Sequence, residues 1–344
     1  MKPGKFYKVL LPTVIVSAVV LVLVAWLRPQ EMARQQILLG TLVEVKVYGT
    51  EEKELDAAID AAFAAFKKVQ ESFSRSGEGE LGRLNQAEPE TLIPASEELL
   101  HLLQESLNYQ ALTDGAFDVT MGELQDLWGF VEDWEGEGQV PTDSEIETFL
   151  AQPRGFRLLD GKAARTSEAT HIDLGAIAKG YAVDKAIEAI KTFKVEAALV
   201  NAGGNLRSFG QVPEPFLFWV EPRPFDVALQ HPRQPNRFLG SFKFKDENAV
   251  ATSGDYQRFF TVDEINYHHI LNPHTGRPSE LLISATVLAP TAMAADALST
   301  AVFVMGPDAG LDLVNNLPDV EAVLVTPEGR VLVSDGLRAG QFSF

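Results

Sequence analysis

A lysine and two glycines stand around the start of a predicted helix in the stretch HIDLGAIAKGYAVDKAIEAI, residues 171–190. Asp173 ends a strand-like run before the Gly175 turn, and Lys179 and Gly180 fall in the first helical turn. A helix N-terminus offers free N–H groups and partial positive charge, so this pattern favours a bound phosphate. The chain contains no G-x-x-x-x-G-K-[ST] motif, and a solvated lysine on an amphipathic helix explains this stretch equally well.

The apolar stretch PTAMAADALSTAVFVMG (290–306) carries Asp296 and Thr300 four positions apart, so one helix face presents both oxygens. A lone carboxylate among apolar residues is costly to bury unless it is paired or binds a metal. Oxygen donors suit Mg²⁺, which usually bridges to a substrate phosphate. We expect a metal site here, ahead of an ion pair with a buried arginine. The anion is then a diphosphate held by Lys179, the helix N-terminus and Mg²⁺, and Asp173 orients its organic part.

Three histidines lie within seven positions: His268, His269 and His274. Their spacing fits neither an i,i+4 helical pair nor a short zinc signature, so a single histidine acting as general base is the simpler expectation. A triad of Ser253, His269 and Asp255 is conceivable, but no G-x-S-x-G motif supports it.

The N-terminal segment has the pattern of a membrane anchor. Three lysines precede the uncharged run VLLPTVIVSAVVLVLVAWL, residues 9–27, which would extend roughly 29 Å as a helix, close to the hydrocarbon thickness of a bilayer. The positive flank predicts a cytoplasmic N-terminus, a single-pass anchor in a bacterial inner membrane and a periplasmic body. A cleaved signal peptide is the alternative, but the run is long and no A-x-A site follows it. The expected organisation is a basic tail (1–8), a transmembrane helix (9–27), a tether (28–37) and one catalytic domain (38–344).

Composition narrows the classes of function. The 344 residues carry a formal charge of −19 and no cysteine. Such a surface repels nucleic acid, and the missing thiols exclude disulfides, thiolate metal sites and a cysteine nucleophile.

The pattern of apolar residues predicts an α+β fold with mixed, largely antiparallel sheets flanked by helices. Predicted helices cover 54–73, 97–112, 176–193, 292–305 and 308–316. Predicted strands cover 38–49, 156–159, 163–166, 169–173, 196–201, 216–221, 240–245, 249–252, 257–262 and 282–288. The stretches 74–91 and 128–145 are turn-rich and aperiodic, so we expect loops there.

Several motifs occur together in the order found in the FAD:protein FMN transferases, the ApbE-type flavin transferases. They are GELGRLNQ, TDGAFDVTMGELQDLWGF, HIDLGAIAKGYAVD, LVNAGGNL, VATSGDYQRFF, YHHILNPHTGRP and ADALSTAVFVMG. The chain resembles this family over about residues 38–334. The resemblance implies an ApbE-like fold and an enzyme that uses Mg²⁺ to transfer the FMN moiety of FAD, through a phosphoester bond, to a threonine or serine hydroxyl of a partner flavoprotein, with release of AMP.

The resemblance also implies roles for individual residues. The flavin side would be Leu39, Ala116, Phe117, Asp118, Asp173 and Ile270. Lys179 would face the phosphate, and His269 would deprotonate the acceptor hydroxyl, with His268 close enough to compete for that role. The metal ligands would be the carbonyl of Ala176 and the side chains of Asp296 and Thr300.

The chain departs from the family pattern in three places. Leu39 stands where a methionine is usual, and SRSGEGEL (74–81) lacks the usual tyrosine. An anchoring helix would replace the acylated cysteine of many members. The implied acceptor is an exported subunit of a membrane redox complex. Two other functions remain open: a metal-dependent FAD pyrophosphatase and a periplasmic module that only binds FAD.

Overall fold

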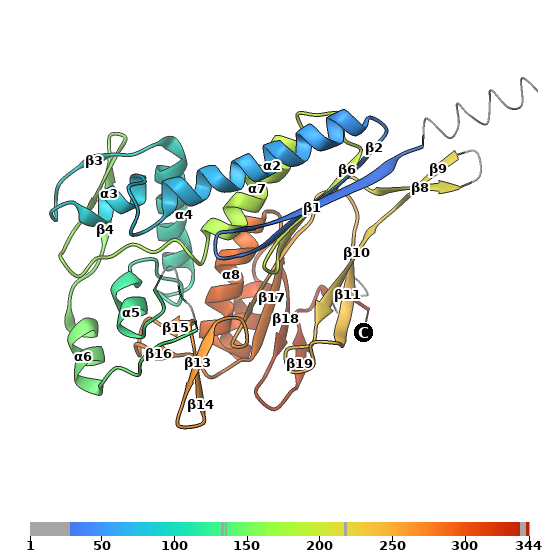
Figure 1. Ribbon diagram of the computed structural model, residues 1–344. Helices are drawn as coiled ribbons and strands as arrows, with labels where there is room; N and C mark the ends of the chain where they lie inside the picture. The colour runs from blue at the N-terminus through green and yellow to red at the C-terminus, as the bar shows by residue number, and fades with distance from the viewer. Residues whose placement is uncertain (1–27, 132–133, 135, 217–218, 338–341, 344) are drawn as a thin grey trace, which may run out of the picture.

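A computed structural model describes residues 28–343 except 132–133, 135, 217–218 and 338–341. Its centre is an eight-stranded sheet in which every neighbouring pair is antiparallel (Figure 1). In spatial order the strands are β1 (Gln30–Leu38), β2 (Thr41–Gly49), β6 (Ala197–Ala202), β7 (Asn205–Phe209), β12 (Ala249–Gly254), β17 (Ser284–Ala289), β18 (Glu321–Val325) and β19 (Val331–Val333).

Helices pack against one face of this sheet. They are α2 (Glu52–Phe73), α7 (Ala178–Ile190), α8 (Ala292–Met305) and α9 (Pro307–Asn315). Helix α4 (Glu97–Leu112) contributes apolar residues to the same core. The apolar stripe predicted along α2 is buried, because residues three and four apart share one side of a helix. Helix α8 is buried on nearly all sides, as its Ala-, Leu- and Val-rich sequence requires. Ser96 caps α4, because its side chain accepts a hydrogen bond from Leu99 N in the first turn of the helix.

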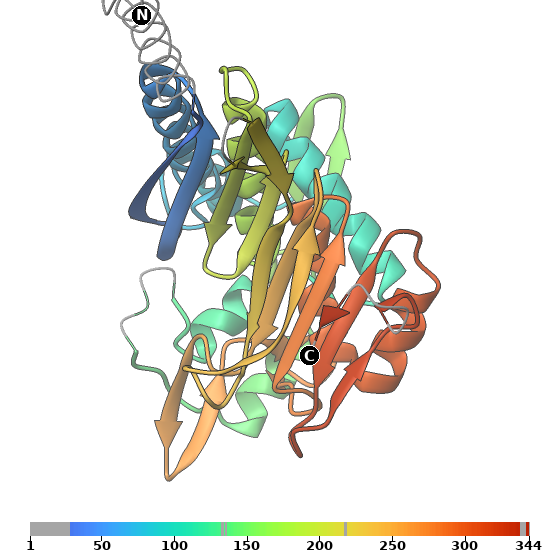
Figure 2. The ribbon, with the colours of Figure 1, turned by 90° about the vertical axis from the view of Figure 1, so that its right-hand side faces the viewer.

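The opposite face of the main sheet is covered by a three-stranded sheet, seen beside it in Figure 2: β10 (Phe225–Gln230), β11 (Phe238–Phe244) and β20 (Phe342–Ser343). Phenylalanines of these strands pack against the main sheet in a second apolar layer. A hairpin of β8 (Val212–Phe216) and β9 (Trp219–Arg223) lies near the edge of the main sheet that β1 and β2 form, as Figure 1 shows.

A smaller lobe surrounds the opening residues of α7 and contains short elements. They are α3 (Glu80–Gln86), β3 (Ile93–Pro94), α5 (Gly122–Leu127), α6 (Asp143–Ala151), β4 (Phe156–Leu159), β5 (Lys162–Arg165), β13 (Phe259–Val262), β14 (Ile265–His268), β15 (Leu271–Asn272) and β16 (Arg277–Pro278). Its own apolar cluster includes Trp128, Phe130 and Phe260. The predicted α+β class with antiparallel sheets is therefore confirmed.

Several local predictions were wrong. Most of the expected tether is strand β1, which pairs with β2 from Gln30 opposite Gly49 to Leu38 opposite Thr41. The expected loops contain α3 and the start of α6, and the expected strand 169–173 makes only an isolated bridge at His171. Within the described part of the chain no helix is long and apolar enough to cross a membrane. The anchor predicted at 9–27 lies outside the described residues.

Candidate functional site

Lys179 and Asp296 face each other where α7 begins against α8. The Lys179 ammonium donates a 2.6 Å hydrogen bond to Gly175 O and lies 3.9 Å from Asp296 Oδ1. The other carboxylate oxygen, Asp296 Oδ2, accepts a 2.9 Å hydrogen bond from Gly180 N. The structure thus brings together the two charged residues that the sequence placed in separate motifs.

The first turn of α7 offers fewer free amides than predicted. The N–H groups of Ile177 and Ala178 already donate to Leu174 O, and that of Gly180 is bonded to Asp296. The expectation that an open helix N-terminus binds the phosphate was therefore wrong for these groups. Lys179 remains the cation available for an anion at this end of α7.

Asp296 is 3% exposed, and burial raises the pKa of its carboxyl group, against the effects of Lys179 and the Gly180 amide. One turn later Thr300 Oγ1 lies 3.2 Å from Ser253 Oγ. A single carboxylate with hydroxyl and carbonyl oxygens is a donor set that fits Mg²⁺ and does not fit zinc. Consistent with that, the described residues contain no group of three His, Cys, Asp or Glu able to hold a metal.

The main chain of Ala176, the third ligand that the resemblance implies, lies in the loop directly ahead of α7 and next to Gly175, whose carbonyl accepts the Lys179 hydrogen bond. The Gly175 carbonyl and the Asp296 carboxylate thus lie at the start of α7, with Ala176 next to Gly175 in the chain and Thr300 one turn along α8 from Asp296. These residues fit the metal that the sequence predicts.

His269 is held as a neutral imidazole. Its Nδ1 lies 3.2 Å from Arg258 O, and because a carbonyl only accepts, Nδ1 carries the proton and Nε2 keeps a lone pair. Burial, with the nearby charges of Arg258 and Lys179, lowers the pKa of His269 to about 3. Within the described chain Nε2 has no protein hydrogen-bond partner, so this nitrogen is available to a substrate hydroxyl.

His268 has a structural role. Its Nε2 lies 2.8 Å from Ser279 O, and its Nδ1 accepts a hydrogen bond from Ile270 N at 3.2 Å. Because both ring nitrogens are engaged, His268 has no lone pair for acid–base chemistry. Of the two histidines, His269 is the one that keeps a ring nitrogen without a partner among the described residues.

The conceivable serine triad is contradicted by the structure. Ser253 Oγ bonds to Ser299 Oγ at 2.9 Å, and Asp255 forms a two-pronged ion pair with Arg233. Neither side chain is directed to His269, so these residues cannot work together as nucleophile, base and orienting acid.

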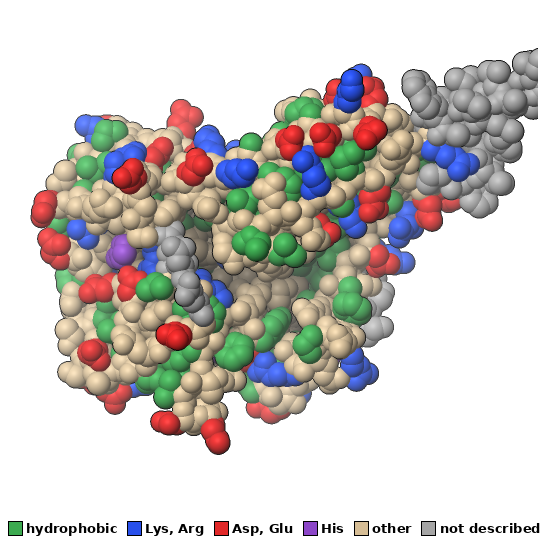
Figure 3. All heavy atoms as spheres, in the orientation of Figure 1, with side chains coloured by type: hydrophobic (Ala, Val, Ile, Leu, Met, Phe, Trp, Pro, Cys, Tyr) green, Lys and Arg blue, Asp and Glu red, His purple; other side chains and the backbone are tan. Residues whose placement is uncertain are grey.

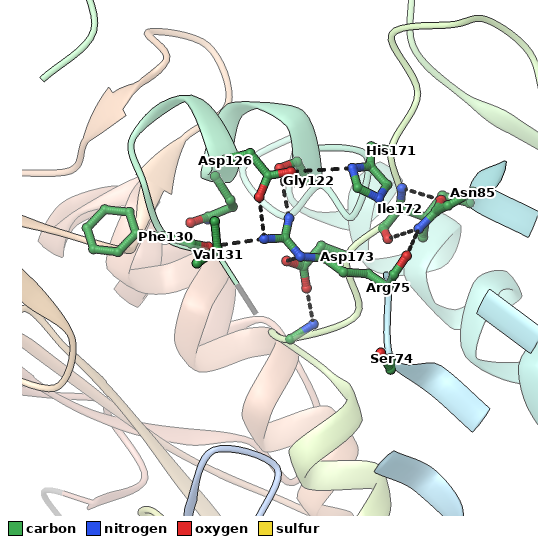
Figure 4. A network of polar contacts seen from close by, with 12 residues as sticks. Ser74, Arg75, Asn85, Gly122, Asp126, Phe130, Val131, His171, Ile172 and Asp173 are labelled. Atoms are coloured by element: carbon green, nitrogen blue, oxygen red, sulfur yellow. Dashed lines mark hydrogen bonds and ion pairs between the residues drawn. The ribbon is translucent and has the colours of Figure 1, made fainter. Parts of the chain in front are cut away.

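Asp173 is held between a turn and an arginine (Figure 4). Its Oδ1 accepts a 2.7 Å hydrogen bond from Gly175 N, and its Oδ2 lies 3.5 Å from Arg75 Nε. Arg75 also donates to Asp126 Oδ1 at 2.6 Å, to Gly122 O and to Phe130 O. Arg75 was not among the predicted site residues, because nothing in its local sequence pattern signals partners so far along the chain.

The remaining predicted flavin contacts lie in three places. Ala116 and Phe117 are buried, whereas Asp118 is partly exposed and uses Oδ1 to accept hydrogen bonds from Thr120 N and Oγ1. Ile270 is buried directly after His269. Leu39 occupies the β1–β2 turn with φ of 52° and packs partly against the core.

The surface is hollowed between the β1–β2 and β13–β14 hairpins (Figure 3). A cavity of about 420 Å³ lies between β10 and the main sheet and is lined by Asn201, Gly203, Gly204, Thr252 and Gln257, among others. None of the predicted site residues lines it. Gln257 is, however, the neighbour of Arg258, whose carbonyl holds His269.

Comparisons with known proteins identify one family throughout. A sequence profile described as the ApbE family matches residues 39–324. A Treponema pallidum protein named FAD:protein FMN transferase is 29% identical over 327 residues, which are 90% of this chain and 88% of the relative. A Vibrio cholerae protein of the same name is 30% identical over 284 residues, 81% of this chain and 82% of the relative.

Solved structures agree. The ApbE protein of Thermotoga maritima is 33% identical with a TM-score of 0.80 and covers 91% of this chain and 99% of its own. The flavin transferase ApbE of Vibrio cholerae is 26% identical with a TM-score of 0.77, covering 90% and 99%. The profile match and these likenesses extend over nearly the whole described body and confirm the resemblance seen in the motifs. The chain belongs to the ApbE family.

Proposed function

We propose that this chain is a Mg²⁺-dependent FAD:protein FMN transferase. It would transfer the FMN moiety of FAD to a threonine or serine hydroxyl of a partner flavoprotein, forming a phosphoester and releasing AMP. The name that its relatives carry supports this activity. The observation that carries the proposal is the grouping of Lys179, buried Asp296 and neutral His269 around the start of α7.

Asp296, Thr300 and the Ala176 carbonyl would hold the metal. Mg²⁺ supplies neutralisation of the charge on the diphosphate oxygens, which is the main requirement of phosphoryl transfer. Lys179 is placed to add a second positive charge beside the metal, because its ammonium lies 3.9 Å from Asp296 Oδ1. Binding the diphosphate would draw Lys179 from Gly175 O toward the anion.

His269 would act on the acceptor. Its Nε2 takes the proton of the hydroxyl while the hydroxyl oxygen attacks the phosphorus of the FMN half, and the bond from that phosphorus to the bridging oxygen breaks. The bridging oxygen leaves with AMP. The low pKa of His269 keeps the imidazole unprotonated at neutral pH and limits its strength as a base. The proton therefore passes to Nε2 as the hydroxyl oxygen bonds to phosphorus, when the hydroxyl is most acidic.

The partner and the location follow from the same proposal. We propose an exported flavoprotein subunit of a membrane redox complex as acceptor, met on the periplasmic side of the inner membrane. The lysine-flanked uncharged run at 9–27 supports anchoring by a helix.

The test uses the full chain purified in detergent, FAD and Mg²⁺, with and without candidate acceptor proteins that carry a surface threonine. AMP is measured by chromatography, and covalent flavin on the acceptor by in-gel fluorescence. AMP together with a fluorescent acceptor, both lost in EDTA, is the expected result. AMP without any labelled acceptor would point to a pyrophosphatase, and FAD binding without AMP would point to a flavin-binding module.

A further inference from the structure

Arg75 is a buried cation placed just beyond the end of α2. Its side chain is 6% exposed, whereas most arginines lie at the surface because desolvating a guanidinium is costly. Figure 4 shows the guanidinium between the carboxylates of Asp126 and Asp173, which come from separate segments. A burial of this kind needs partners on every side, and the surrounding segments supply them.

One side of the guanidinium holds α5 and the residues just after it, the segment 122–130. Arg75 Nη1 donates to Gly122 O at 2.8 Å, and Nη2 donates to Phe130 O at 3.2 Å as well as to Asp126. The same segment then contacts the proposed base. Gln125 Nε2 donates a 3.0 Å hydrogen bond to His269 O, and the Phe130 ring meets the imidazole edge-on at 6.3 Å.

The other side of the guanidinium faces Asp173. Arg75 Nε lies 3.5 Å from Asp173 Oδ2, while Asp173 Oδ1 accepts from Gly175 N. Gly175 in turn accepts the Lys179 hydrogen bond through its carbonyl. A continuous series of contacts therefore runs from His269 through Arg75 to the residue placed against the diphosphate.

The main chain of Arg75 is fixed as well. Asn85 Nδ2 donates to Arg75 O at 3.1 Å and to Ile172 O at 2.9 Å, and Asn85 Oδ1 accepts from Ile172 N. One buried amide thus joins the backbone of Arg75 to the residue immediately before Asp173. The backbone contacts through Asn85 and the side-chain contact between Arg75 and Asp173 together fix the separation of these two charged groups.

Only arginine has the geometry for these contacts. Its planar guanidinium presents five donors in a fixed fork, whereas the lysine ammonium is a single point with three. The stretch from 74 to 81 contains no aromatic ring that could order a ligand by stacking. A ligand bound near residues 74–81 would therefore be ordered by polar contacts.

We infer that Arg75 is a positioning residue, which holds the Asp173 carboxylate at a fixed separation from the segment 122–130 that supports His269. This inference rests on the proposed function, in which Asp173 contacts the organic part of FAD. Without Arg75, the hydrogen bond from Gly175 N to Oδ1 would hold Asp173, and Oδ2 would lose its cation. Arg75 itself does not touch the substrate in this assignment and acts through Asp173.

The test compares Arg75→Lys with Arg165→Lys in the full chain. Arg165 is a matched control, because it is 8% exposed, lines a pocket together with Arg75 and donates to the carbonyls of Ala87 and Thr170. Both variants keep the positive charge and lose the hydrogen bonds that only the planar guanidinium can make. We expect both to lower the melting temperature, but only Arg75→Lys to weaken FAD binding, by about tenfold or more, since small misplacements of a positioning group are costly.

FAD affinity is measured by flavin fluorescence per folded molecule, and AMP formation gives KM and kcat separately. A KM effect for FAD in Arg75→Lys with a smaller kcat effect is expected. Asp126→Asn keeps Arg75 and removes the negative charge of one of its partners, so it gives a second measurement of the same effect if Arg75→Lys does not fold. We expect a weakening of FAD binding of about two- to fivefold there.

A double-variant cycle separates an action through Asp173 from a general loss of packing. If Arg75 acts through Asp173, FAD affinity in the double variant Arg75→Lys, Asp173→Asn falls no further than in the weaker-binding single variant. Additive losses, or equal FAD affinities in Arg75→Lys and Arg165→Lys, would overturn the inference. A wild-type chain that binds FAD but releases no AMP would defeat the proposed function alone, since the affinity series still decides the role of Arg75.

Discussion

The amide of Gly180 donates a 2.9 Å hydrogen bond to Asp296 Oδ2 and so joins the helix that carries Lys179 to the helix that carries the predicted metal ligands. The two helices approach closely here. A Cβ atom at position 180 would lie 2.2 Å from Ala292 O and 2.8 Å from Asp296 Cβ. Only glycine allows this approach, and the carboxylate is thereby held beside the start of α7.

Gly180→Ala is expected to force α7 and α8 apart. We expect a loss of unfolding free energy of about 1–3 kcal/mol, the usual range for overpacking a core, and a larger proportional loss of AMP release because Asp296 moves. Urea unfolding and AMP chromatography measure the two effects. Gly161→Ala is the control, since its φ of 75° is strained for alanine but no atom lies within 4 Å of the added Cβ. Equal losses in both variants would argue against close packing as the cause.

Asp296→Asn should separate stability from activity. Burial raises the pKa of Asp296, so the folded state disfavours the ionised form and becomes less stable as pH rises through that pKa. Asparagine keeps an acceptor for Gly180 N and removes the buried charge. We expect equal or higher stability without Mg²⁺, no stabilisation by added Mg²⁺ and nearly complete loss of transfer. Thermal melts with and without Mg²⁺ measure this, and a Mg²⁺-dependent rise in melting temperature in the variant would contradict the ligand assignment.

The two histidines should respond in opposite ways. His269→Gln removes the free Nε2 and is expected to lower transfer by about 10²–10⁴-fold, the range for a general base, with little change in folding. His268→Gln cannot satisfy both Ser279 O and Ile270 N in the same geometry, so we expect a cost of about 1–3 kcal/mol in stability and transfer per folded molecule close to wild type. Active-fraction titration with FAD normalises both rates. The reverse pattern would assign the base to His268.

His269 also makes stability depend on pH. In the unfolded chain its pKa is near the ordinary 6.5, and in the folded chain burial beside Arg258 and Lys179 lowers the pKa to about 3. Above the unfolded pKa both states are neutral and the residue contributes nothing. Between the two pKa values the unfolded chain alone takes up the proton, so the folded state loses stability as pH falls. His269→Gln should therefore gain stability relative to wild type from about pH 7 to about pH 4.5. A constant difference over that range would show an imidazole with a normal pKa.

The sequence predicted regular elements where one periodicity dominates. The α2 stripe and the bounds of α8 follow from apolar spacing, and the shared helix face of Asp296 and Thr300 follows from their i,i+4 spacing. Strand β1 was missed because its residues alternate between exposed and partly exposed positions, so an edge strand of polar composition looks like a tether. Its pairing with β2 decides its structure.

Site geometry was predictable only where residues lie close in sequence. The ion pair of Arg75 and Asp173 joins segments almost a hundred positions apart, and the Gly180 contact to Asp296 spans 116. No local pattern encodes such contacts, because tertiary packing creates them. Ser253 and His269 are near in sequence, but tertiary packing directs Ser253 to Ser299 and His269 to the carbonyl of Arg258. The predicted serine triad therefore does not form.

Asp184 and Arg207 support the helix that carries Asp296, and breaking their pair gives the last prediction. Asp184 accepts the N–H groups of Ala292 and Met293 at 2.9 Å each, and Arg207 Nη1 lies 2.7 Å from Asp184 Oδ1. Burial raises the pKa of Asp184 and Arg207 opposes that shift. Arg207→Met leaves the buried carboxylate without its cation, so we expect a loss of about 3–5 kcal/mol at neutral pH.

The loss should shrink in acid, because protonating Asp184 removes the uncompensated charge and the folded pKa of this group is raised further without Arg207. Urea unfolding at about pH 5 and about pH 8 measures the difference. Arg223→Met is the control, since Arg223 and its partner Glu214 are more than half exposed and such pairs contribute about 1 kcal/mol or less. Because α8 begins at the residues that Asp184 binds, Arg207→Met should also weaken Mg²⁺-dependent stabilisation, whereas Arg223→Met should not. A pH-independent loss in Arg207→Met would mean that packing of the arginine stem, and not its charge, supports the start of α8.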